Sequence, residues 1–409
     1  MLSGVRPGLE RVRRALDVLG HPEESFASVL VGGTNGKGSV SSLLSSVLRT
    51  AGFRTGLFTS PHLVSVRERV QVNGVSITPR SWAKAQEKIA SLERWKIKLT
   101  EFEVHALVAF LEFERAGVDI AVLEVGLGGR LDAVNVVSAP EISVITSIGL
   151  DHTDWLGPTR RHIYHEKRGI ARPGSPLIQS VPSSLEAESR RFSLDTGVSL
   201  WTLGRDILVT KSERIFPGQR FTVTLPDAVY EKVCVPFWGD HQVRNGALAV
   251  AVLHRLSRQG WSISKNDLTR GMARARWPGR FQVVSRRPPV VLDGAHNPDA
   301  ARALRKAWLS SPWGSQKVTL IFGCLKDKDV RGVIRELSPV VERVVVTGLP
   351  SSRACPPEHL ASFWEKKVPV RVAENFEKAW TFVQNEKRTP TLITGSLYLV
   401  GEAIDKDIT

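Results

Sequence analysis

A short glycine-rich turn between an apolar run and an amphipathic segment constrains the fold of this chain more than any other feature. The run Val29–Val31 enters a turn that carries Lys37 and Ser39 among four glycines, Gly32, Gly33, Gly36 and Gly38. Glycines let successive backbone N–H groups point toward an anion, and the following helix adds the positive end of its dipole. Lys37 supplies a mobile cation and Ser39 an oxygen for Mg²⁺. The turn predicts a strand–loop–helix unit that binds nucleoside triphosphate.

The flanks of the turn favour this interpretation over a plain connecting loop. One face of the predicted helix is apolar and consists of Val40, Leu43, Leu44 and Val47. The spacing differs from the common phosphate loop, because Gly38 separates Lys37 from Ser39. The shorter form resembles the loop of the Mur ligase superfamily, whose members use ATP to make amide bonds.

The composition is that of a globular protein with two or three domains. The 409 residues are 42% hydrophobic and 24% charged, and 56 Lys and Arg against 41 Asp and Glu leave a net charge of +15. This charge favours anionic ligands such as nucleotides and polycarboxylates, but the basic residues do not cluster into a nucleic-acid-binding run. Three widely spaced cysteines predict free thiols in a reducing compartment. The sequence has no signal-peptide core and no apolar run of about 18 residues, so we expect a cytoplasmic protein without a membrane anchor.

The order of apolar and helical patterns predicts the fold class. Buried strands alternate with helices along the first 150 residues, which is typical of a parallel, doubly wound α/β sheet. The segment from Val198 to Val235 has short alternating runs with Gly and Pro breaks, and predicts a β-rich excursion. Pro278-Gly279 then precedes a second α/β series without a phosphate loop, which predicts a Rossmann-like sheet. We therefore expect an ATP-binding domain over 1–279 and a C-terminal domain over 280–409.

Polar side chains at the ends of predicted strands are candidate ligand contacts. Glu124 closes a buried strand, at a position from which α/β nucleotide enzymes reach Mg²⁺. Asp151 and His152 follow the next strand, and chemistry alone favours Asp151 as the ligand because hard Mg²⁺ prefers carboxylate oxygen to imidazole. Lys167 lies in a predicted helix and reads, from the residues alone, as a surface lysine. In the second series, strand ends carry Asp293, His296 and Ser396, which we expect to face a cleft between the domains.

Together these motifs resemble the bifunctional dihydrofolate synthase/folylpolyglutamate synthases of the Mur ligase superfamily, over nearly the whole chain. The resemblance rests on the segments 33–39, Thr59–Leu63, Glu124–Ala133, Leu150–Thr153, Glu166-Lys167, Pro278–Phe281 and Asp293–Pro298. Two positions depart from the family pattern. Arg168 follows Lys167 where a small residue is usual, and Gly246 follows Asn245 where alanine is common.

The resemblance implies a role for each matching residue. The ATP phosphates would be held by Gly33, Thr34, Asn35, Gly36, Lys37, Gly38 and Ser39, with Arg280 reaching them from the hinge, Asn245 contacting adenine and Asp293 near the nucleotide. Two Mg²⁺ ions would be held by Ser39, Ser60, Glu124 and His152, which reverses the choice between Asp151 and His152. Lys167 would be carbamylated and become a carboxylate-like metal partner.

The resemblance also implies the reaction and its substrates. Glutamate would bind near Asp293, His296 and Ser396, and the pterin near Thr100, Phe102, Asp132 and Ala133. The enzyme would add L-glutamate to dihydropteroate and to reduced folates through an acyl phosphate, with Lys37, Lys167, Arg280 and His296 as catalytic candidates. His296 either accepts the amine proton or only binds. A monofunctional enzyme of either kind is the alternative, although the pterin-side residues favour both activities.

Two other functions compete with this one. A cell-wall Mur ligase with a UDP-linked substrate shares the loop and the metal site but carries a further nucleotide-binding domain ahead of the loop, where this chain has a short predicted helix. A nucleic-acid-stimulated NTPase would fit the net charge and would require salt-dependent nucleic-acid binding. We expect no nucleic-acid partner and a monomer.

Overall fold

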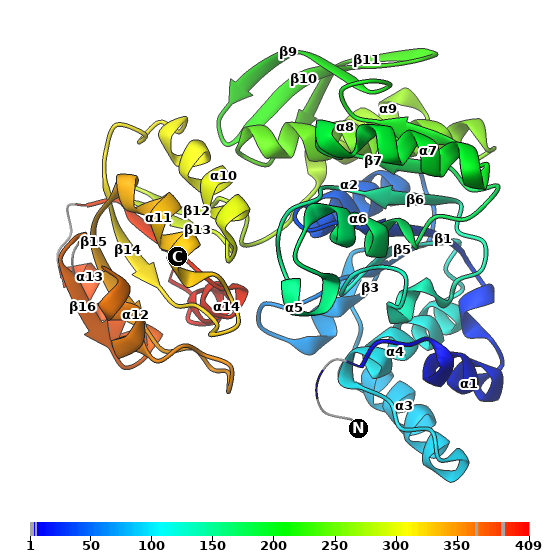
Figure 1. Cartoon of the computed structure of the whole chain (residues 1–409), viewed down its shortest axis with the longest axis horizontal. Helices are drawn as coiled ribbons and strands as arrows, with labels where there is room; N and C mark the ends of the chain where they lie inside the picture. The colour runs from blue at the N-terminus through cyan, green and yellow to red at the C-terminus, as the bar shows by residue number, and fades with distance from the viewer. Residues whose placement is uncertain (1–3, 5, 365–366, 386–388, 409) are drawn as a thin grey trace.

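A mostly parallel sheet of eight strands organises the first half of the chain, and the strand before the phosphate loop lies near its centre (Figure 1). The computed structural model describes residues 4, 6–364, 367–385 and 389–408, so the start of the chain, on which the expected lack of a signal peptide depends, is only partly included. The sheet has the order β4-β3-β2-β5-β1-β6-β7-β8. Its strands are β1 (Ala27–Gly32), β2 (Thr55–Phe58), β3 (Val70–Val72), β4 (Val75–Ser76), β5 (Ile120–Glu124), β6 (Ile142–Ile145), β7 (Leu177–Gln179) and β8 (Leu200–Thr202).

Strand β1 shows why these runs are continuously apolar. It pairs in parallel with β5 on one side and β6 on the other. Side chains alternate between faces, so Val29 and Val31 join one hydrophobic core while Leu30 joins the other. Because helices cover both faces, every residue of the strand interior is buried.

The helices of this lobe divide between the two faces of the sheet. On one face Leu30 packs with apolar residues of α1, α3, α4 and α6, and on the other Val29 and Val31 pack with those of α2, α8 and α9. The helices are α1 (Glu10–Leu19), α2 (Lys37–Thr50), α3 (Pro79–Ala90), α4 (Glu101–Ala116), α5 (Thr153–Leu156), α6 (Arg160–Arg168), α7 (Glu186–Thr196), α8 (Asp240–Arg258) and α9 (Lys265–Arg274).

A three-stranded antiparallel sheet forms the β-rich excursion and packs against α8. It consists of β9 (Leu208–Ile215), β10 (Gly218–Leu225) and β11 (Ala228–Val235), with β10 in the middle. Phe221 and Val223 of β10 are fully buried in the core that contains α8, whereas almost all of β9 is exposed. Figure 1 shows this sheet at the outer edge of the lobe, away from the phosphate loop.

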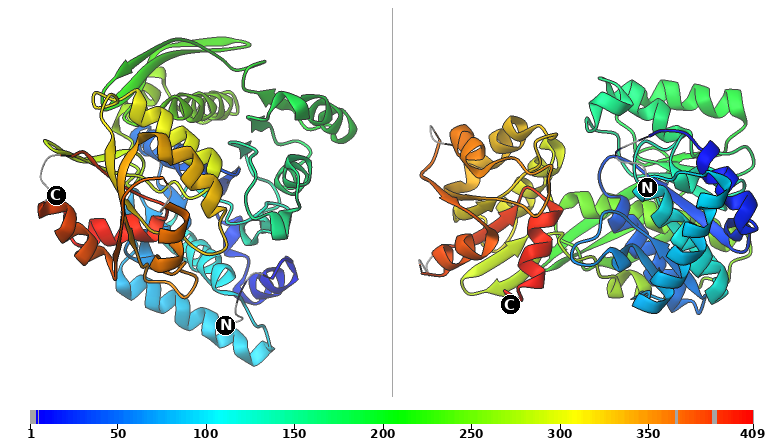
Figure 2. Two further views of the ribbon diagram at one scale, coloured as in Figure 1. Left: turned by 60° about the vertical axis from the view of Figure 1, so that its left-hand side comes forward. Right: turned by 90° about the horizontal axis from the view of Figure 1, so that it is seen from below.

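The C-terminal lobe is a second α/β unit with a sheet of its own, and the right-hand view of Figure 2 shows it beside the first lobe. Its strand order is β12-β13-β17-β14-β15-β16, parallel except for the β12–β13 pair. The strands are β12 (Gln282–Arg286), β13 (Pro289–Leu292), β14 (Val318–Phe322), β15 (Val341–Thr347), β16 (Val370–Ala373) and β17 (Thr391–Thr394). The helices are α10 (Pro298–Leu309), α11 (Val330–Leu337), α12 (Pro357–Trp364), α13 (Phe376–Asn385) and α14 (Leu397–Asp405).

The predicted fold class is confirmed: a parallel first sheet, a β-rich excursion and a second α/β sheet follow one another along the chain. Helices α5, α7, α9, α11, α12 and α14 were not predicted from the sequence. Among the helices of the described residues, none is long and apolar enough to cross a membrane.

Substitution of Trp308 measures how much the hydrophobic core of the C-terminal lobe contributes to stability. The indole is fully buried, and its Nε1 donates a hydrogen bond of 2.9 Å to the carbonyl of Gln316. We expect Trp308→Ala to lower the free energy of unfolding by about 3–5 kcal/mol, because it leaves a cavity and an unpaired carbonyl. Urea denaturation followed by circular dichroism measures this. Trp95→Ala is the control, since Trp95 is 55% exposed, and equal losses in both variants would contradict the assignment.

Candidate active site

The phosphate loop connects β1 to α2, and its shape depends on glycine at two positions. Gly33 and Gly36 have positive φ angles of 143° and 90°. A Cβ on Gly33 would lie 2.0 Å from Oγ1 of Thr146, and one on Gly36 would lie 2.5 Å from Oδ1 of Asn245. No other residue type fits either position without moving the loop.

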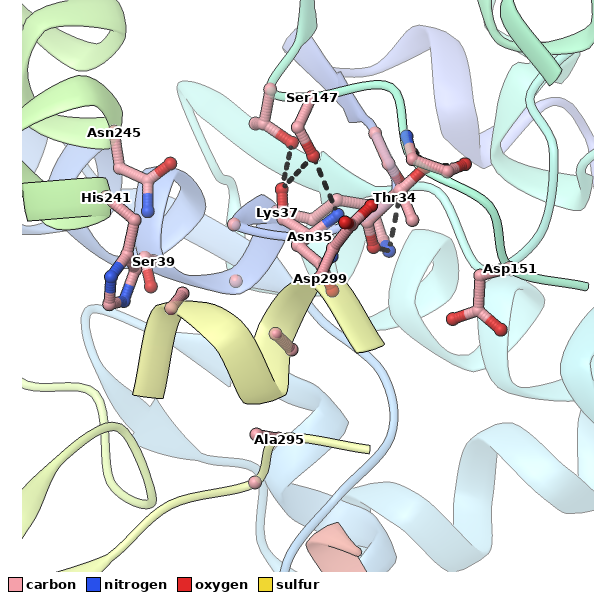
Figure 3. A pocket seen from close by; sticks show the side chains of 18 of the residues that line it. Thr34, Asn35, Lys37, Ser39, Ser147, Asp151, His241, Asn245, Ala295 and Asp299 are labelled. Atoms are coloured by element: carbon pink, nitrogen blue, oxygen red, sulfur yellow. Dashed lines mark hydrogen bonds between the residues drawn. The ribbon is translucent and has the colours of Figure 1, made fainter. Parts of the chain in front are cut away.

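The end of β6 holds the loop in place. The backbone N–H of Asn35 donates to Oγ of Ser147 at 2.9 Å, and the carbonyl of Asn35 accepts from Oγ1 of Thr146 at 2.7 Å and from Oγ of Ser147 at 2.9 Å. The hydroxyl of Thr34 donates to the carbonyl of Gly149 at 3.2 Å. Figure 3 shows this part of the pocket, with bonds drawn between the loop and Ser147. The loop is therefore held by backbone and hydroxyl contacts with the end of β6.

Two lysine side chains converge on one carbonyl of the loop. Nζ of Lys37 lies 3.1 Å and Nζ of Lys167 3.0 Å from the carbonyl oxygen of Gly33. Lys167 is 4% exposed, so the sequence-based reading of a surface lysine is wrong. Burial, followed by the nearby ammonium of Lys37, lowers the pKa of Lys167 to about 7. A large fraction of Lys167 is therefore an uncharged, nucleophilic amine at neutral pH.

Glu124 is a buried carboxylate at the end of β5, next to the loop. Its register partner in β1 is Val31, and the residue is 3% exposed. Burial raises the pKa of Glu124 to about 7, against the lowering effects of Lys37 and of a hydrogen bond from the backbone of Ser60. Its Oε2 has no hydrogen-bond partner among the described residues. A buried oxygen left without a donor, beside hydroxyl oxygens of the pocket, fits a Mg²⁺ ligand.

Asp151 and His152 differ in what they already contact. Oδ1 of Asp151 lies 2.7 Å from Nζ of Lys328, and Oδ2 accepts from Nδ2 of Asn297 at 3.1 Å. Burial alone would raise the pKa of Asp151, but the Lys328 ammonium together with the neighbouring His152 and His296 holds the pKa below its ordinary value. Partial burial also lowers the pKa of His152, so its imidazole is neutral at pH 7. The Asp151 carboxylate is thus engaged by the C-terminal lobe.

The C-terminal lobe contributes the segment after β13 to the same cavity. The two oxygens of Asp293 accept from the backbone N–H groups of Phe281 and Ala295 at 2.8 and 2.9 Å, which orders this segment. Nδ1 of His296 lies 2.8 Å from the carbonyl of Gly294 and must therefore carry the proton. Burial and Lys328 lower the pKa of His296, which leaves Nε2 as a free base at neutral pH.

The resulting cavity lies between the two lobes and has a volume of about 420 Å³. The structure brings most of the predicted site residues to its wall: Gly33, Thr34, Asn35, Gly36, Lys37, Gly38, Ser39, Ser60, Glu124, His152, Lys167, Asn245, Arg280, Asp293 and His296. Figure 3 shows Asn245 and His241 to the left of Lys37, with Asp299 of the C-terminal lobe next to Asn35 and with Ala295 lower in the view. His241, Gln242 and Ser147 also line the cavity and were missed in the sequence, where no motif set them apart.

Five predicted site residues do not line this cavity: Thr100, Phe102, Asp132, Ala133 and Ser396. Their local contacts are structural. Thr100 caps α4 by accepting from the N–H of Glu103, and Ser396 caps α14 by accepting from the N–H of Tyr398. Asp132 accepts from two backbone N–H groups within its own loop. The pterin and glutamate roles of these residues therefore stay predictions.

Direct contacts between the lobes were not predicted. The side-chain amides of Asn35 and Asn297 exchange hydrogen bonds of 3.0 and 3.3 Å, so the phosphate loop is tied to the start of α10. The Asp151–Lys328 ion pair reinforces this contact. The unusual Arg168 points elsewhere, since its guanidinium lies 4.8 Å from the Phe192 ring centroid and 3.7 Å from a carboxylate oxygen of Glu188.

Comparisons with known proteins agree with this arrangement. The model of the Mur ligase middle domain matches residues 31–253, and that of the Mur ligase glutamate ligase domain matches residues 279–397. The chain is 32% identical to the dihydrofolate synthase/folylpolyglutamate synthase of Bacillus subtilis over 98% of this chain and 94% of that protein. It is 33% identical to the folylpolyglutamate synthase of Lacticaseibacillus casei over 95% of this chain and 92% of that protein. The structure of Escherichia coli FolC in complex with DHPP and ADP aligns with a TM-score of 0.91 and 32% identity, covering 99% of this chain and 94% of that one.

Because the pKa of Glu124 is raised, we predict that the increase in nucleotide affinity caused by Mg²⁺ depends on pH. A protonated carboxyl does not ligate the ion, so Mg²⁺ should strengthen ADP binding more at pH 8 than at pH 6. In Glu124→Gln we expect the factor by which Mg²⁺ strengthens ADP binding to fall by about tenfold or more. We also expect this factor to depend less on pH than in the wild type. Calorimetric titration with and without Mg²⁺ measures both effects. Glu101→Gln is the control, because its side chain is 70% exposed; an unchanged Mg²⁺ gain in Glu124→Gln would refute the assignment.

Proposed function

Because the chain belongs to the Mur ligase family, within its dihydrofolate synthase/folylpolyglutamate synthase group, we propose that it is an ATP-dependent ligase that joins L-glutamate to folate-type carboxylates. The acceptors are dihydropteroate and reduced folates, as the name of the Bacillus subtilis relative indicates. The observation that carries the proposal is the cavity between the lobes, in which a phosphate loop with Lys37 faces Arg280 and His296 of the second lobe.

The geometry suits acyl phosphate chemistry. A carboxylate is a poor electrophile, so transfer of the γ-phosphoryl group of ATP to it creates the leaving group that the amide bond requires. Lys37 spreads the charge of the transferring group from the loop side, and Arg280 does so from the C-terminal side. Nε2 of His296, which lies 3.8 Å from Oδ2 of Asp151, would either accept the proton of the glutamate amine or only bind the substrate. Both lobes must hold their substrates together, since proximity supplies much of the rate.

Mg²⁺ binding is part of the proposal. The donors would be the hydroxyls of Ser39 and Ser60, the free oxygen of Glu124 and the neutral imidazole of His152, with a carbamate on Lys167 as a further oxygen donor for a second ion. Bound Mg²⁺ would neutralise the charge that develops on the phosphate oxygens. The lowered pKa of Lys167 supports carbamylation, because only the uncharged amine adds to CO₂.

The substrate sites around the reacting centre follow from the same resemblance. Asn245 on α8 would contact adenine, and Asp293 would lie near the nucleotide. L-Glutamate would bind near Asp293, His296 and Ser396 at the strand ends of the second lobe. The pterin would bind beside Thr100, Phe102, Asp132 and Ala133. Of these residues, Phe102 lies next to the cavity between the lobes. Gly126 lines that cavity, and a Cβ on Gly126 would lie 2.5 Å from the Phe102 ring.

We further propose that the protein works as a cytoplasmic monomer with two domains, 1–279 and 280–409. The proposed boundary falls between the end of α9 and the start of β12, where the chain passes from the first lobe to the second. The ligase requires no nucleic acid.

An acceptor assay tests the reaction and its range. Purified protein is incubated with ATP, Mg²⁺ and labelled L-glutamate, once with dihydropteroate and once with tetrahydrofolate monoglutamate. We expect label in both acceptors and one phosphate released per amide, with no stimulation by duplex or single-stranded DNA. Product from only one acceptor would establish a monofunctional enzyme, and phosphate release without any acceptor would defeat the ligase proposal.

A second test addresses Lys167. Its pKa near 7 means that the amine is protonated, and unable to form a carbamate, as the pH falls below about 7. We expect the ligase rate to drop from pH 8 to pH 6 and to rise with added bicarbonate. The ligase rate of Lys167→Arg should be about 100-fold lower than that of the wild type. Carbon NMR with labelled bicarbonate should show a carbamate signal in the wild type and not in Lys167→Arg. Lys306→Arg is the control, because Lys306 is an exposed lysine on α10. A wild-type spectrum without the carbamate signal would contradict the proposed carbamylation of Lys167.

A further inference from the structure

A second cavity lies beside α2 and the segment that joins the two lobes. Its volume is about 650 Å³, and among the described residues it shares no wall residue with the cavity between the lobes. Its wall includes Arg49 and Ser45 of α2, together with Arg274 at the end of α9 and Arg276 in the joining segment. Neither the resemblance nor the proposed reaction assigns this cavity a role.

The charged groups on the wall of this second cavity are all positive. Three arginines line it, and no aspartate or glutamate does so among the described residues. The guanidinium groups of Arg274 and Arg276 make no ion pair or hydrogen bond within the part of the chain that the structure describes. Cations gathered without a counter-charge raise the local concentration of anions. The second cavity therefore favours an anionic ligand.

Arg49 is the best ordered of the three cations. Its guanidinium donates to the backbone carbonyls of Asn73 and Ser45 at 3.1 and 3.4 Å. The turn at Gly74, with a φ of 75°, leaves room for it, since a Cβ there would lie 2.1 Å from Nη1 of Arg49. Burial lowers the pKa of Arg49, because the charged group loses hydration and no carboxylate pairs with it among the described residues. An anion in the cavity would offset that cost.

Serine hydroxyl groups line the α2 side of the cavity. The hydroxyl of Ser42 donates to the backbone carbonyl of Arg276 at 2.8 Å, which holds the joining segment against α2. The hydroxyl of Ser46 donates to the carbonyl of Gly271 at 2.7 Å. Ser45 is 2% exposed and lines the cavity, yet its hydroxyl makes no hydrogen bond within the described residues. A buried hydroxyl without a partner is uncommon, and this one is free to donate to a ligand in the cavity.

We propose that the second cavity binds a small oligoanion, a molecule with two or three phosphate or carboxylate groups a few ångströms apart. The three guanidinium groups come from α2, the end of α9 and the joining segment, so each can pair with a different anionic group of one ligand. Guanidinium groups bind phosphate and carboxylate alike in a bidentate manner. The hydroxyl of Ser45 would donate to the same ligand.

An oligoanion fits this cavity better than a single orthophosphate does. One phosphate group would leave most of the 650 Å³ unfilled. Among the described residues the wall has no run of glycines, whose backbone N–H groups would converge on one phosphate as they do in the phosphate loop. A bound oligoanion would tie Arg276 of the joining segment to Arg49 of α2. The inference goes beyond the proposed ligase function and does not depend on it.

Titration calorimetry with inorganic tripolyphosphate and with citrate tests the site. The full-length protein is first given excess ADP without Mg²⁺, so that nucleotide occupies the phosphate loop and no probe is lost as a magnesium complex. We expect the wild type to bind at least one probe at a single site. The double variant Arg274→Gln/Arg276→Gln should bind it about 100-fold more weakly, because two charge-assisted contacts are lost. Both side chains are exposed, so the fold should hold, and Arg270→Gln, also exposed on α9, is the control.

Ser45 distinguishes a formed site from general attraction of anions to a positive surface. Ser45→Ala keeps every charge and removes the unpartnered hydroxyl, so we expect the affinity for the probe to fall about tenfold. Ser41→Ala is the matched control. Ser41 also lies on α2, is fully buried and has a hydroxyl without a hydrogen-bond partner among the described residues, but it does not line the cavity. Its replacement should leave the affinity at the wild-type value.

The two probes also identify the source of the anion. Binding of tripolyphosphate alone supports a phosphate ligand, and binding of citrate alone supports a polycarboxylate. Binding of neither probe to the wild type would overturn the inference, and so would wild-type affinity in the double variant or in Ser45→Ala. Affinity that falls as ADP is raised would mean that the probe occupied the phosphate loop, and would overturn it too. The single variant Arg276→Gln repeats the test should circular dichroism show that the double variant misfolds.

Discussion

Two ammonium groups within about 3 Å of one carbonyl oxygen govern the chemistry of this site. Lys37 and Lys167 both reach the carbonyl of Gly33. Burial is the main cause of the lowered pKa of Lys167, and repulsion by the nearby Lys37 ammonium lowers that pKa further. An anion between them, or a change of Lys167 into an anion, relieves the repulsion. The same contact prepares the site for phosphate and for metal.

The buried carboxylate of Glu124 is a second group near the loop whose charge is unfavourable without a counter-ion. A carboxylate without a donor for one oxygen is costly in a dry site, and the raised pKa records that cost. The cations around the loop lower it in part, and a divalent ion would remove it. A magnesium nucleotide bound in the cavity would therefore reverse these unfavourable interactions, and strongly shifted pKa values of this kind are common at functional sites.

The second lobe completes the site through few but specific contacts. The Asn35–Asn297 amide pair and the Asp151–Lys328 ion pair join the phosphate loop and the end of β6 to the C-terminal lobe. His296, next to Asn297 in the chain, and Arg280 line the same cavity as Lys37. The segment that joins the lobes also carries Trp277, which rests on the phosphate loop at Gly38.

The sequence by itself determined the phosphate loop, the two α/β series and the strand-end residues that line the cavity, because glycine spacing and strand periodicity are local properties. It did not determine helices such as α7, whose one buried residue is Ser189 and which has no apolar stripe to recognise. Only the tertiary structure decided that Lys167 is buried and that Asp151 is paired with Lys328. Burial and pairing depend on what the rest of the chain packs against each side chain, and no local pattern contains that information.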